Sequence, residues 1–340
     1  MFIKKNNNRD KINTPLTLVF TPRNEEEHIR NILSKILAID DLNYEVVVVD
    51  DFSQDNSFSA LGLLSQQYSH LKISSLNQET RYSVKLAQNI ALKSATNNWV
   101  LIRPIALNEV KSEWLHGISQ NMKGENVDLV IGYSSVVRAS GMFNLLYRIE
   151  NFYQQITNAG YIFSGVPFVY NEDNLAFKKD KYFQQGGYGK NIKESYANLE
   201  LIANLFITKK NTVVDFSRES AICKAIEINK AEYVDLMRKR FRIEKHLPLW
   251  KRSVLFIDSF TNLLYLPVIV LAMVFVSPVW LLIIILVGVL LFIHVLIIKI
   301  TQNRLNERKI FISSLIYGLF IPYYKLFHKW YFKQSNGKYE

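Results

Sequence analysis

The sequence predicts an α/β fold, a doubly wound domain, followed by transmembrane helices. In the first part, short β-branched runs alternate with segments of helical periodicity, the order typical of a doubly wound sheet. Residues 45–50 are apolar on both faces, as expected for a parallel strand covered by helices on both sides. Residues 279–298 form a long apolar run with one ionisable residue, His294, long enough to cross a bilayer.

The composition excludes several classes of protein. The 340 residues are 49% hydrophobic and 21% charged, which excludes a disordered chain. One cysteine, Cys223, rules out an intrachain disulfide and fits a reducing compartment. The six histidines show no zinc-like spacing. Residues 1–8 lack the apolar core of a secretory signal, so we expect the N-terminal domain to lie in the cytoplasm.

A net charge of +11 is compatible with nucleic acid or with a membrane surface. Its distribution favours the membrane, since basic residues bracket the apolar segments, and we expect no nucleic-acid partner. The two basic runs contain Arg238, Lys239, Arg240, Arg242, Lys245, Lys251 and Arg252, and then Lys299, Arg304, Arg308 and Lys309.

The N-terminal elements follow from periodicity. Asn24 is a candidate N-cap, and the acidic residues after it suit the start of a helix. The apolar stripe of this predicted helix comprises Ile29, Ile32, Leu33, Ile36 and Leu37. The carboxyl ends of parallel strands form the ligand-binding edge of such sheets, so Asp50-Asp51 and Arg103-Pro104 are expected to face one crevice. Strands are predicted at 16–20, 45–50, 71–75, 99–103 and 127–132, and further helices at 57–68, 84–95 and 112–122.

The C-terminal part is predicted to enter an inner or plasma membrane. Residues 256–276 and 279–298 would form a transmembrane hairpin around the turn at 277–278, with both ends cytoplasmic. The alternative is a buried helical pair in a soluble core. Residues 310–327 are less apolar and suit an interfacial or re-entrant helix. The predicted divisions are a tail at 1–13, the α/β domain at 14–236, a basic interfacial segment at 237–253, the hairpin at 254–299, and the remainder at 300–340.

The richest motif is Val49-Asp50-Asp51-Phe52-Ser53-Gln54-Asp55-Asn56-Ser57, preceded by Arg23-Asn24-Glu25-Glu26. A carboxylate at a strand end can accept hydrogen bonds from a uracil imide and from ribose hydroxyls. The alternative is an acidic loop that caps the next helix through Asp55 or Ser57. The motif resembles the nucleotide-binding start of family-2 glycosyltransferases, and segments 85–95, 174–179 and 183–188 resemble further motifs of that family in the same order.

The resemblance covers residues 14–245. It implies a GT-A fold, an inverting transfer from a nucleotide sugar, here a UDP-sugar, and a polysaccharide or lipid acceptor, as in the membrane-bound branch of the family. The residues that it implies for nucleotide binding are Arg23, Glu25, Asp50, Asp51, Ser53, Asp55 and Lys85.

The chain departs from the family where the chemistry is expected. The family's Asp-x-Asp, which holds Mg²⁺ or Mn²⁺, aligns with Pro104-Ile105-Ala106, so the metal ligands are missing. The base motif aligns with Ser195-Tyr196-Ala197-Asn198. Electrostatic stabilisation of the leaving group is often worth several kcal/mol, and a general base contributes roughly 10²–10⁴-fold. Proline and alanine supply neither.

Other residues could compensate for these losses. Arg103 could replace the cation, because a guanidinium pairs well with phosphate; alternatively, it caps its strand in solvent. Glu194 and Glu200 flank the missing base, although Glu200 falls on a helix face where acids are usually solvated. Arg240 keeps the arginine of the family's acceptor-side segment, while the basic run around it could instead attract anionic lipid.

Three functions remain open from the sequence. The protein could be a metal-independent transferase, or a catalytically dead relative that binds nucleotide or a partner synthase. It could also be a structural membrane protein that uses the fold as an interaction module.

Overall fold

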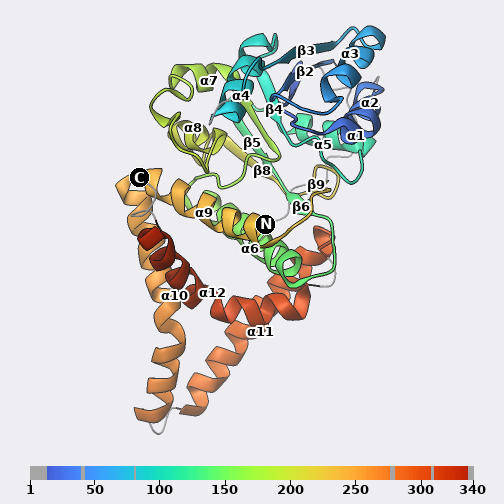
Figure 1. The fold of residues 1–340 in the computed structure, drawn as a ribbon. Helices are drawn as coiled ribbons and strands as arrows, with labels where there is room; N and C mark the ends of the chain where they lie inside the picture. Colours follow the sequence, from blue (N-terminus) through green and yellow to red (C-terminus); the bar gives the residue numbers. More distant parts are fainter. Residues whose placement is uncertain (1–13, 40–42, 80–81, 276–279, 308–309, 336–340) are drawn as a thin grey trace. The chain divides into compact units, whose positions relative to one another are not determined.

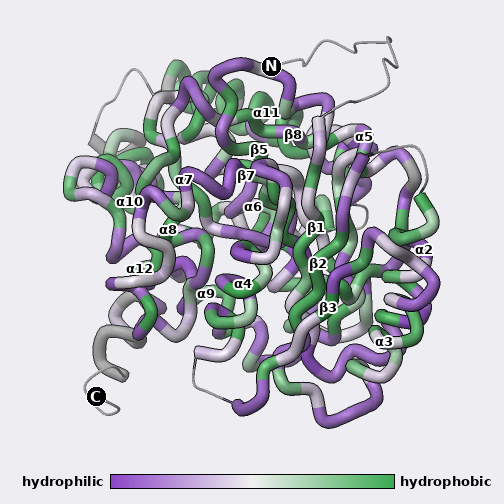
Figure 2. The backbone as a smooth tube through the Cα atoms, turned by 90° about the horizontal axis from the view of Figure 1, so that it is seen from above, coloured by the Kyte–Doolittle hydropathy of each residue, from purple (hydrophilic) through white to green (hydrophobic). Residues whose placement is uncertain are grey.

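The computed structural model describes residues 14–39, 43–79, 82–275, 280–307 and 310–335. It divides the chain into two compact units. Unit 1 comprises residues 1–137 and 157–226, and unit 2 comprises residues 138–156 and 227–340. Figure 1 labels most elements of the two units, and Figure 2 also labels β1 and β7.

Unit 1 is built on a seven-stranded sheet with the order β3-β2-β1-β4-β7-β5-β8. Every neighbouring pair is parallel except the two pairs made by β7. A two-stranded parallel sheet pairs β6, Ser134–Val136, with β9, Ile222–Lys224. The main strands are β1 Leu16–Phe20, β2 Tyr44–Asp50, β3 Leu71–Ser75, β4 Trp99–Ile102, β5 Leu129–Gly132, β7 Leu175–Lys178 and β8 Thr212–Asp215.

The helices of unit 1 alternate with these strands, which confirms the α/β prediction. The first helical stretch joins α1 Glu26–His28, a π-helical turn at Ile29–Leu33 and α2 Ser34–Leu37. It is followed by α3 Ser57–Gln67, α4 Ser83–Ser94, α5 Ser112–Gln120, α7 Lys179–Gln184, a 3₁₀ turn at Gly189–Asn191 and α8 Leu199–Phe206.

One local prediction is wrong. Asn24 is not an N-cap, since it has a positive φ of 54° and α1 begins only at Glu26. The sheet itself is mixed, because β7 runs antiparallel to both β4 and β5. Strand β7 has only four residues, too few for periodicity to reveal its direction.

The main core lies between the sheet and the helices of unit 1. Alternate residues of β1, β2 and β4, such as Leu18, Val46 and Leu101, pack with Trp114 of α5 and with Ile29 and Leu33 of the first helical stretch. Figure 2 shows β1 and β2 side by side in hydrophobic colouring. Both strands are buried along their whole length. A ligand can therefore be contacted only by the polar residues at and beyond the carboxyl ends of these strands.

Unit 2 is helical. Helix α6, Met142–Ser164, belongs to unit 2 up to residue 156 and to unit 1 beyond it. The other helices are α9 Lys230–His246, α10 Leu249–Phe275, α11 Trp280–Arg304 and α12 Phe311–Ser335. Helices α10 and α11 approach each other at the bottom of Figure 1 and diverge toward the top. The turn predicted at 277–278 lies outside the described residues.

Two helices of unit 2, over Leu249–Ala272 and Ile284–Arg304, are long and apolar enough to cross a membrane, and only 6% of each is buried. By contrast, α6 joins α9 and α12 through aromatic rings and through buried polar contacts. Glu150 is fully buried and accepts hydrogen bonds from Arg240, Gln154 and Tyr317 at 3.0–3.1 Å. Unit 2 therefore combines an exposed apolar pair of helices with a polar interior.

Candidate functional site

One edge of the main sheet collects most of the predicted site residues. The parallel pairing of β1, β2 and β4 places Arg23, Asp51 and Arg103 beyond the carboxyl ends of neighbouring strands. Strand β7 starts at this same edge, since Leu175 pairs with Ile102 at the end of β4. The strand order changes direction between β1 and β4, which is the switch point where α/β sheets bind ligands.

Hydrogen bonds join the loops after β1 and β2 at this edge. Asp50 accepts hydrogen bonds from the backbone N–H of Ser53 at 3.0 Å and from its hydroxyl at 2.5 Å. The Ser53 hydroxyl oxygen accepts from the N–H of Asn24 at 2.9 Å, and Asn24 Oδ1 accepts from the N–H of Gln54 at 2.7 Å. Asn24 and Phe52 hold the turns with left-handed φ values of 54° and 57°. Asp50 and Ser53 are thus engaged in shaping the loop.

A second pair of contacts ties the starts of α1 and α3. Asp55 accepts from the N–H of Ser57 at 3.0 Å and from the N–H of Glu26 at 3.2 Å. The Ser57 hydroxyl accepts from the N–H of Glu25 at 3.0 Å. Asp55 therefore satisfies helix N-terminal donors, which agrees with the capping interpretation of this residue.

Asp51 differs from its neighbours in the motif. Its side chain is 1% exposed. One carboxylate oxygen accepts from the Ser83 hydroxyl at 3.1 Å, whereas Oδ1 has no hydrogen-bond partner among the described residues. Burial raises the pKa of the Asp51 carboxyl above its usual 3.8. A buried acceptor without a donor is costly, so this oxygen is suited to a ligand that brings an N–H or O–H.

Arg23 lies beside Asp51 on the outer part of the edge. Its guanidinium pairs with Glu79 at 2.6 Å in an exposed ion pair. The side-chain hydrogen bond to Glu79 raises the pKa of Arg23. Exposed pairs of this kind contribute little to stability, so Arg23 can be recruited by an anionic ligand at small cost. Arg81, which lies between Glu79 and α4 in the sequence, falls outside the described residues.

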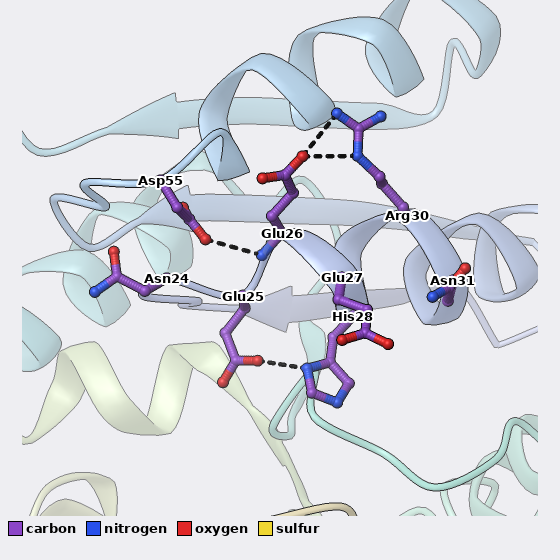
Figure 3. Close-up of a pocket in the computed structure, with 8 residues that line it drawn as sticks. All are labelled: Asn24, Glu25, Glu26, Glu27, His28, Arg30, Asn31 and Asp55. Atoms are coloured by element: carbon purple, nitrogen blue, oxygen red, sulfur yellow. Dashed lines mark hydrogen bonds and ion pairs between the residues drawn. The ribbon is translucent and has the colours of Figure 1, made fainter.

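A hollow of about 510 Å³ opens at the first turn of α1. Figure 3 shows that its lining is largely acidic and internally paired. Glu25 contacts His28 at 2.6 Å, and Glu26 pairs with Arg30 at 2.9 Å. Glu25, which the resemblance implies for nucleotide binding, therefore lines this hollow. The full lining is Asn24, Glu25, Glu26, Glu27, His28, Arg30, Asn31 and Asp55.

Arg103 follows β4 and is 4% exposed, so it does not cap the strand in solvent. Its guanidinium carbon lies 3.5 Å from the ring centroid of Trp114, which is a stacking contact. Nε and Nη1 are buried with no hydrogen-bond partner among the described residues. Burial lowers the pKa of Arg103 well below its usual value. The end of β4 thus contains a buried cation for which the described residues provide no ion-pair partner.

The residues at this strand end do not fit a divalent cation. Pro104, Ile105 and Ala106 carry no ligand atoms in their side chains, and the neighbouring Arg103 would repel a metal ion. Within the described parts of the chain, no group of three or more His, Cys, Asp or Glu residues could hold one. The Mg²⁺ or Mn²⁺ implied by the resemblance thus has no site at this position.

Lys85 on α4 has a different environment from a phosphate-binding lysine. It is 2% exposed, and its ammonium group donates to the carbonyl oxygens of Asn191 at 2.9 Å, Ile192 at 3.4 Å and Glu194. An ammonium group has three donors, and all three are used here. Burial lowers the pKa of Lys85. Lys85 therefore anchors the 191–194 loop in this structure.

The candidates for a missing base occupy contrasting positions. Glu200 on α8 is fully buried and accepts from the backbone N–H groups of Glu172 at 3.1 Å and Asn198 at 3.0 Å. The expectation that Glu200 lies on a solvated helix face is wrong. Glu194 is half-buried and accepts from the N–H of Tyr196 at 3.3 Å.

Arg240 belongs to α9 in unit 2. It pairs with the buried Glu150 at 3.1 Å and with Glu244 at 3.0 Å. These contacts link α9 to α6 within the unit. The structure therefore gives Arg240 a role in the polar interior of unit 2.

Sequence reasoning missed three residues at the edge of unit 1. Ser83 binds Asp51. Asn174 fills the space above Gly132 and donates to the carbonyl oxygens of Tyr133 and Ser220 at 3.1 and 2.9 Å. Glu172 holds the start of α8. The available signal was the polar stretch 171–174 directly before an apolar run, but only the pairing of β7 with β4 places it at this edge.

Comparison with known proteins agrees with this architecture. Residues 17–169 match the family model described as glycosyl transferase family 2. A mannosyltransferase from Pyrobaculum calidifontis, solved with GDP-mannose and Mn²⁺, shares the fold at a TM-score of 0.52 and 18% identity, over 88% of this chain and 86% of that chain. A search of curated protein sequences finds no match.

Two further solved structures have lower similarity. TarS 1–349 from S. aureus, in complex with UDP-GlcNAc, has a TM-score of 0.46 and 16% identity, over 68% of this chain and 66% of that one. Glucosyl-3-phosphoglycerate synthase from Mycobacterium tuberculosis, with Mn²⁺, UDP and glucosyl-3-phosphoglycerate, has a TM-score of 0.46 and 12% identity, over 69% and 81% of the two chains.

Proposed function

We propose that unit 1 binds a nucleotide sugar at the edge around Asp51. The premise is that this chain carries a family-2 glycosyltransferase domain with a GT-A fold. The nucleotide is taken to be UDP, and the product to be a polysaccharide or a glycolipid. The observation that supports the proposal most strongly is the buried Asp51 Oδ1, which accepts no hydrogen bond from any described residue. A uracil imide N–H or a ribose hydroxyl would supply that donor.

The remaining motif residues support this assignment indirectly. Asp50, Ser53 and Asp55 fix the two loops through their side chains, so the backbone around Asp51 is preorganised before the ligand arrives. Preorganisation reduces the entropy lost on binding. Arg23, held by one exposed ion pair, is available to the diphosphate.

Transfer in this protein is proposed to be metal-independent and weak. The end of β4 does not fit a metal, and the buried Arg103 guanidinium lacks a counter-charge among the described residues. Arg103 would pair with the diphosphate and stabilise the charge that develops when the sugar leaves. Turnover of a nucleotide sugar by the purified protein tests this step.

A second candidate function is that of a catalytically dead partner of an intact synthase. The observation in its favour is that Glu200, a candidate base, and Lys85, expected to bind the nucleotide, are both engaged with backbone groups. Such a protein would bind nucleotide without turnover and would copurify with an active synthase.

Unit 2 is proposed to anchor the protein in the inner or plasma membrane. Helices α10 and α11 present large apolar side chains to the outside, among them Leu271, Leu282 and Phe292, and basic residues flank them. The proposal places both ends of this hairpin, and unit 1, in the cytoplasm. Extraction of the protein from membranes by alkaline carbonate alone would contradict the anchor.

The nucleotide proposal predicts a specific loss in Asp51→Asn. Removing the charge from a buried acceptor that binds a ligand donor costs about 1.5–3 kcal/mol, so the affinity for UDP should fall roughly 10–100-fold. Calorimetric titration of UDP into detergent-solubilised protein measures this. Asp180→Asn, an exposed aspartate on α7, is the matched control and should bind UDP as the wild type does. Equal UDP affinity in Asp51→Asn and wild type would contradict the proposal.

A further inference from the structure

A carboxylate still occupies the helix end where the base motif is missing. Glu172 lies just before β7, outside the aligned motif. Its two carboxylate oxygens accept from Asn198 Nδ2 at 3.1 Å and from the N–H of Leu199 at 2.9 Å. Asn198 is the N-cap residue of α8, and the missing base aligns with Ser195–Asn198. A different segment of the chain therefore delivers a carboxylate to the same helix end.

Glu172 is better placed than the two glutamates flanking the motif. Glu200 is fully buried, with no exposed surface that an acceptor could reach. Glu194 belongs to the loop that Lys85 anchors. Glu172 is 9% exposed, whereas Glu200 is 0% exposed, so part of the Glu172 residue reaches the surface.

The surroundings of Glu172 connect it to the ligand edge. Leu175 pairs with Ile102, so residues 172–174 lie where β4 ends. In the same segment, Asn174 is 2% exposed, and its Oδ1 has no hydrogen-bond partner among the described residues. An unsatisfied buried acceptor indicates a donor that arrives with a ligand, and a sugar or acceptor hydroxyl is such a donor.

We infer that Glu172 is the general base of sugar transfer in this protein, an inference that rests on the proposed nucleotide-sugar function. The Glu172 carboxylate would take the proton of the acceptor hydroxyl while the hydroxyl oxygen forms a bond to the anomeric carbon. The bond from that carbon to the diphosphate oxygen breaks, and its electron pair leaves with the nucleoside diphosphate. The Leu199 N–H and the Asn198 amide orient the carboxylate for this step.

The test is nucleotide release by the full-length protein in detergent. UDP-glucose, UDP-N-acetylglucosamine, UDP-galactose and GDP-mannose are supplied separately, with water as the acceptor. Glu172→Gln should reduce release from the donor that the wild type uses by roughly 10²–10⁴-fold, with unchanged affinity for UDP. The acid limb of its pH–rate profile should disappear, because that limb reports ionisation of the base.

Two variants separate catalysis from folding. Glu113→Gln, at an exposed glutamate on α5, is the matched control and should release nucleotide as the wild type does. Glu172→Asp retains the carboxylate and should recover part of the activity that Glu172→Gln loses. Melting curves check that each variant is folded, and glutamine can still accept the Leu199 N–H.

The outcomes distinguish this inference from the function on which it rests. Release by Glu172→Gln at the wild-type rate would overturn the assignment of the base. A wild type that binds UDP but releases nucleotide from none of the four donors would also overturn it, while leaving nucleotide binding intact. Failure to bind UDP would overturn the proposed function and the inference together.

Discussion

Glu307→Ala is expected to destabilise unit 2 by about 3–5 kcal/mol, the cost of removing one partner of a buried ion pair. Arg148 on α6 and Glu307, which follows α11, pair at 2.9 Å with side chains only 6% and 3% exposed. Alanine would leave the Arg148 charge buried without that carboxylate. Thermal unfolding of the detergent-solubilised protein, followed by calorimetry, measures the loss.

Two comparisons make this prediction specific. Asp235→Ala breaks the exposed pair with Arg238, whose side chains are 34% and 52% exposed, and should cost less than about 1 kcal/mol. The double variant Arg148→Met/Glu307→Leu removes both charges and should recover most of the stability, since apolar groups of similar volume often replace buried pairs without loss. Equal melting temperatures for Glu307→Ala and Asp235→Ala would show that the pair is solvated.

Arg103→Met is expected to stabilise the ligand-free protein and to weaken its binding of UDP. The guanidinium is 4% exposed, and two of its nitrogens lack partners among the described residues. Methionine fills a similar space and keeps a favourable contact with the Trp114 ring. Exchanging buried charge for apolar volume has stabilised other proteins by about 1–4 kcal/mol, and a gain in that range is expected in the unfolding of unit 1.

The loss in binding has a separate cause. Without the guanidinium, the diphosphate loses a charge-assisted contact worth about 1.5–3 kcal/mol, so the affinity for UDP should fall roughly 10–100-fold. Arg103→Lys keeps the charge but not the planar fork and should bind UDP with intermediate affinity. A lower melting temperature for Arg103→Met would mean that the guanidinium is paired in the folded protein. Unchanged affinity would remove Arg103 from the donor site.

The sequence was sufficient for most elements of unit 1 because the signals there are local. The predicted strands at 16–20 and 71–75 have the observed bounds of β1 and β3. The valine run at 46–49 predicted a strand buried on both faces, as β2 is. The direction of β7 could not be predicted, because it depends on partners far away in the sequence. The π-helical turn at Ile29–Leu33 could not be predicted either, because the spacing of the apolar residues there is that of an ordinary α-helix.

The site was predicted in position rather than in detail. The motif correctly placed Asp50 and Asp51 at a strand end. It could not show that the Asp50 carboxylate binds Ser53, or that Asp51 Oδ1 has no hydrogen-bond partner among the described residues. Lys85 and Glu200 lie on helices whose polar positions usually face solvent, yet loop carbonyls and backbone N–H groups draw them inside. The Lys85 ammonium group, for example, binds a carbonyl oxygen 106 residues away in the sequence. The spacing of residues within a motif cannot predict a contact over that separation.

The measurement that tests the account most directly is calorimetric titration of UDP into the detergent-solubilised full-length protein, first with Mn²⁺ and then with EDTA. The account predicts binding with the same affinity in both conditions, because Asp51 and Arg103 recognise the nucleotide and the end of β4 has no metal ligands. Binding that requires Mn²⁺ would contradict it by showing that other residues hold a cation. Absence of binding in both conditions would contradict the nucleotide site itself.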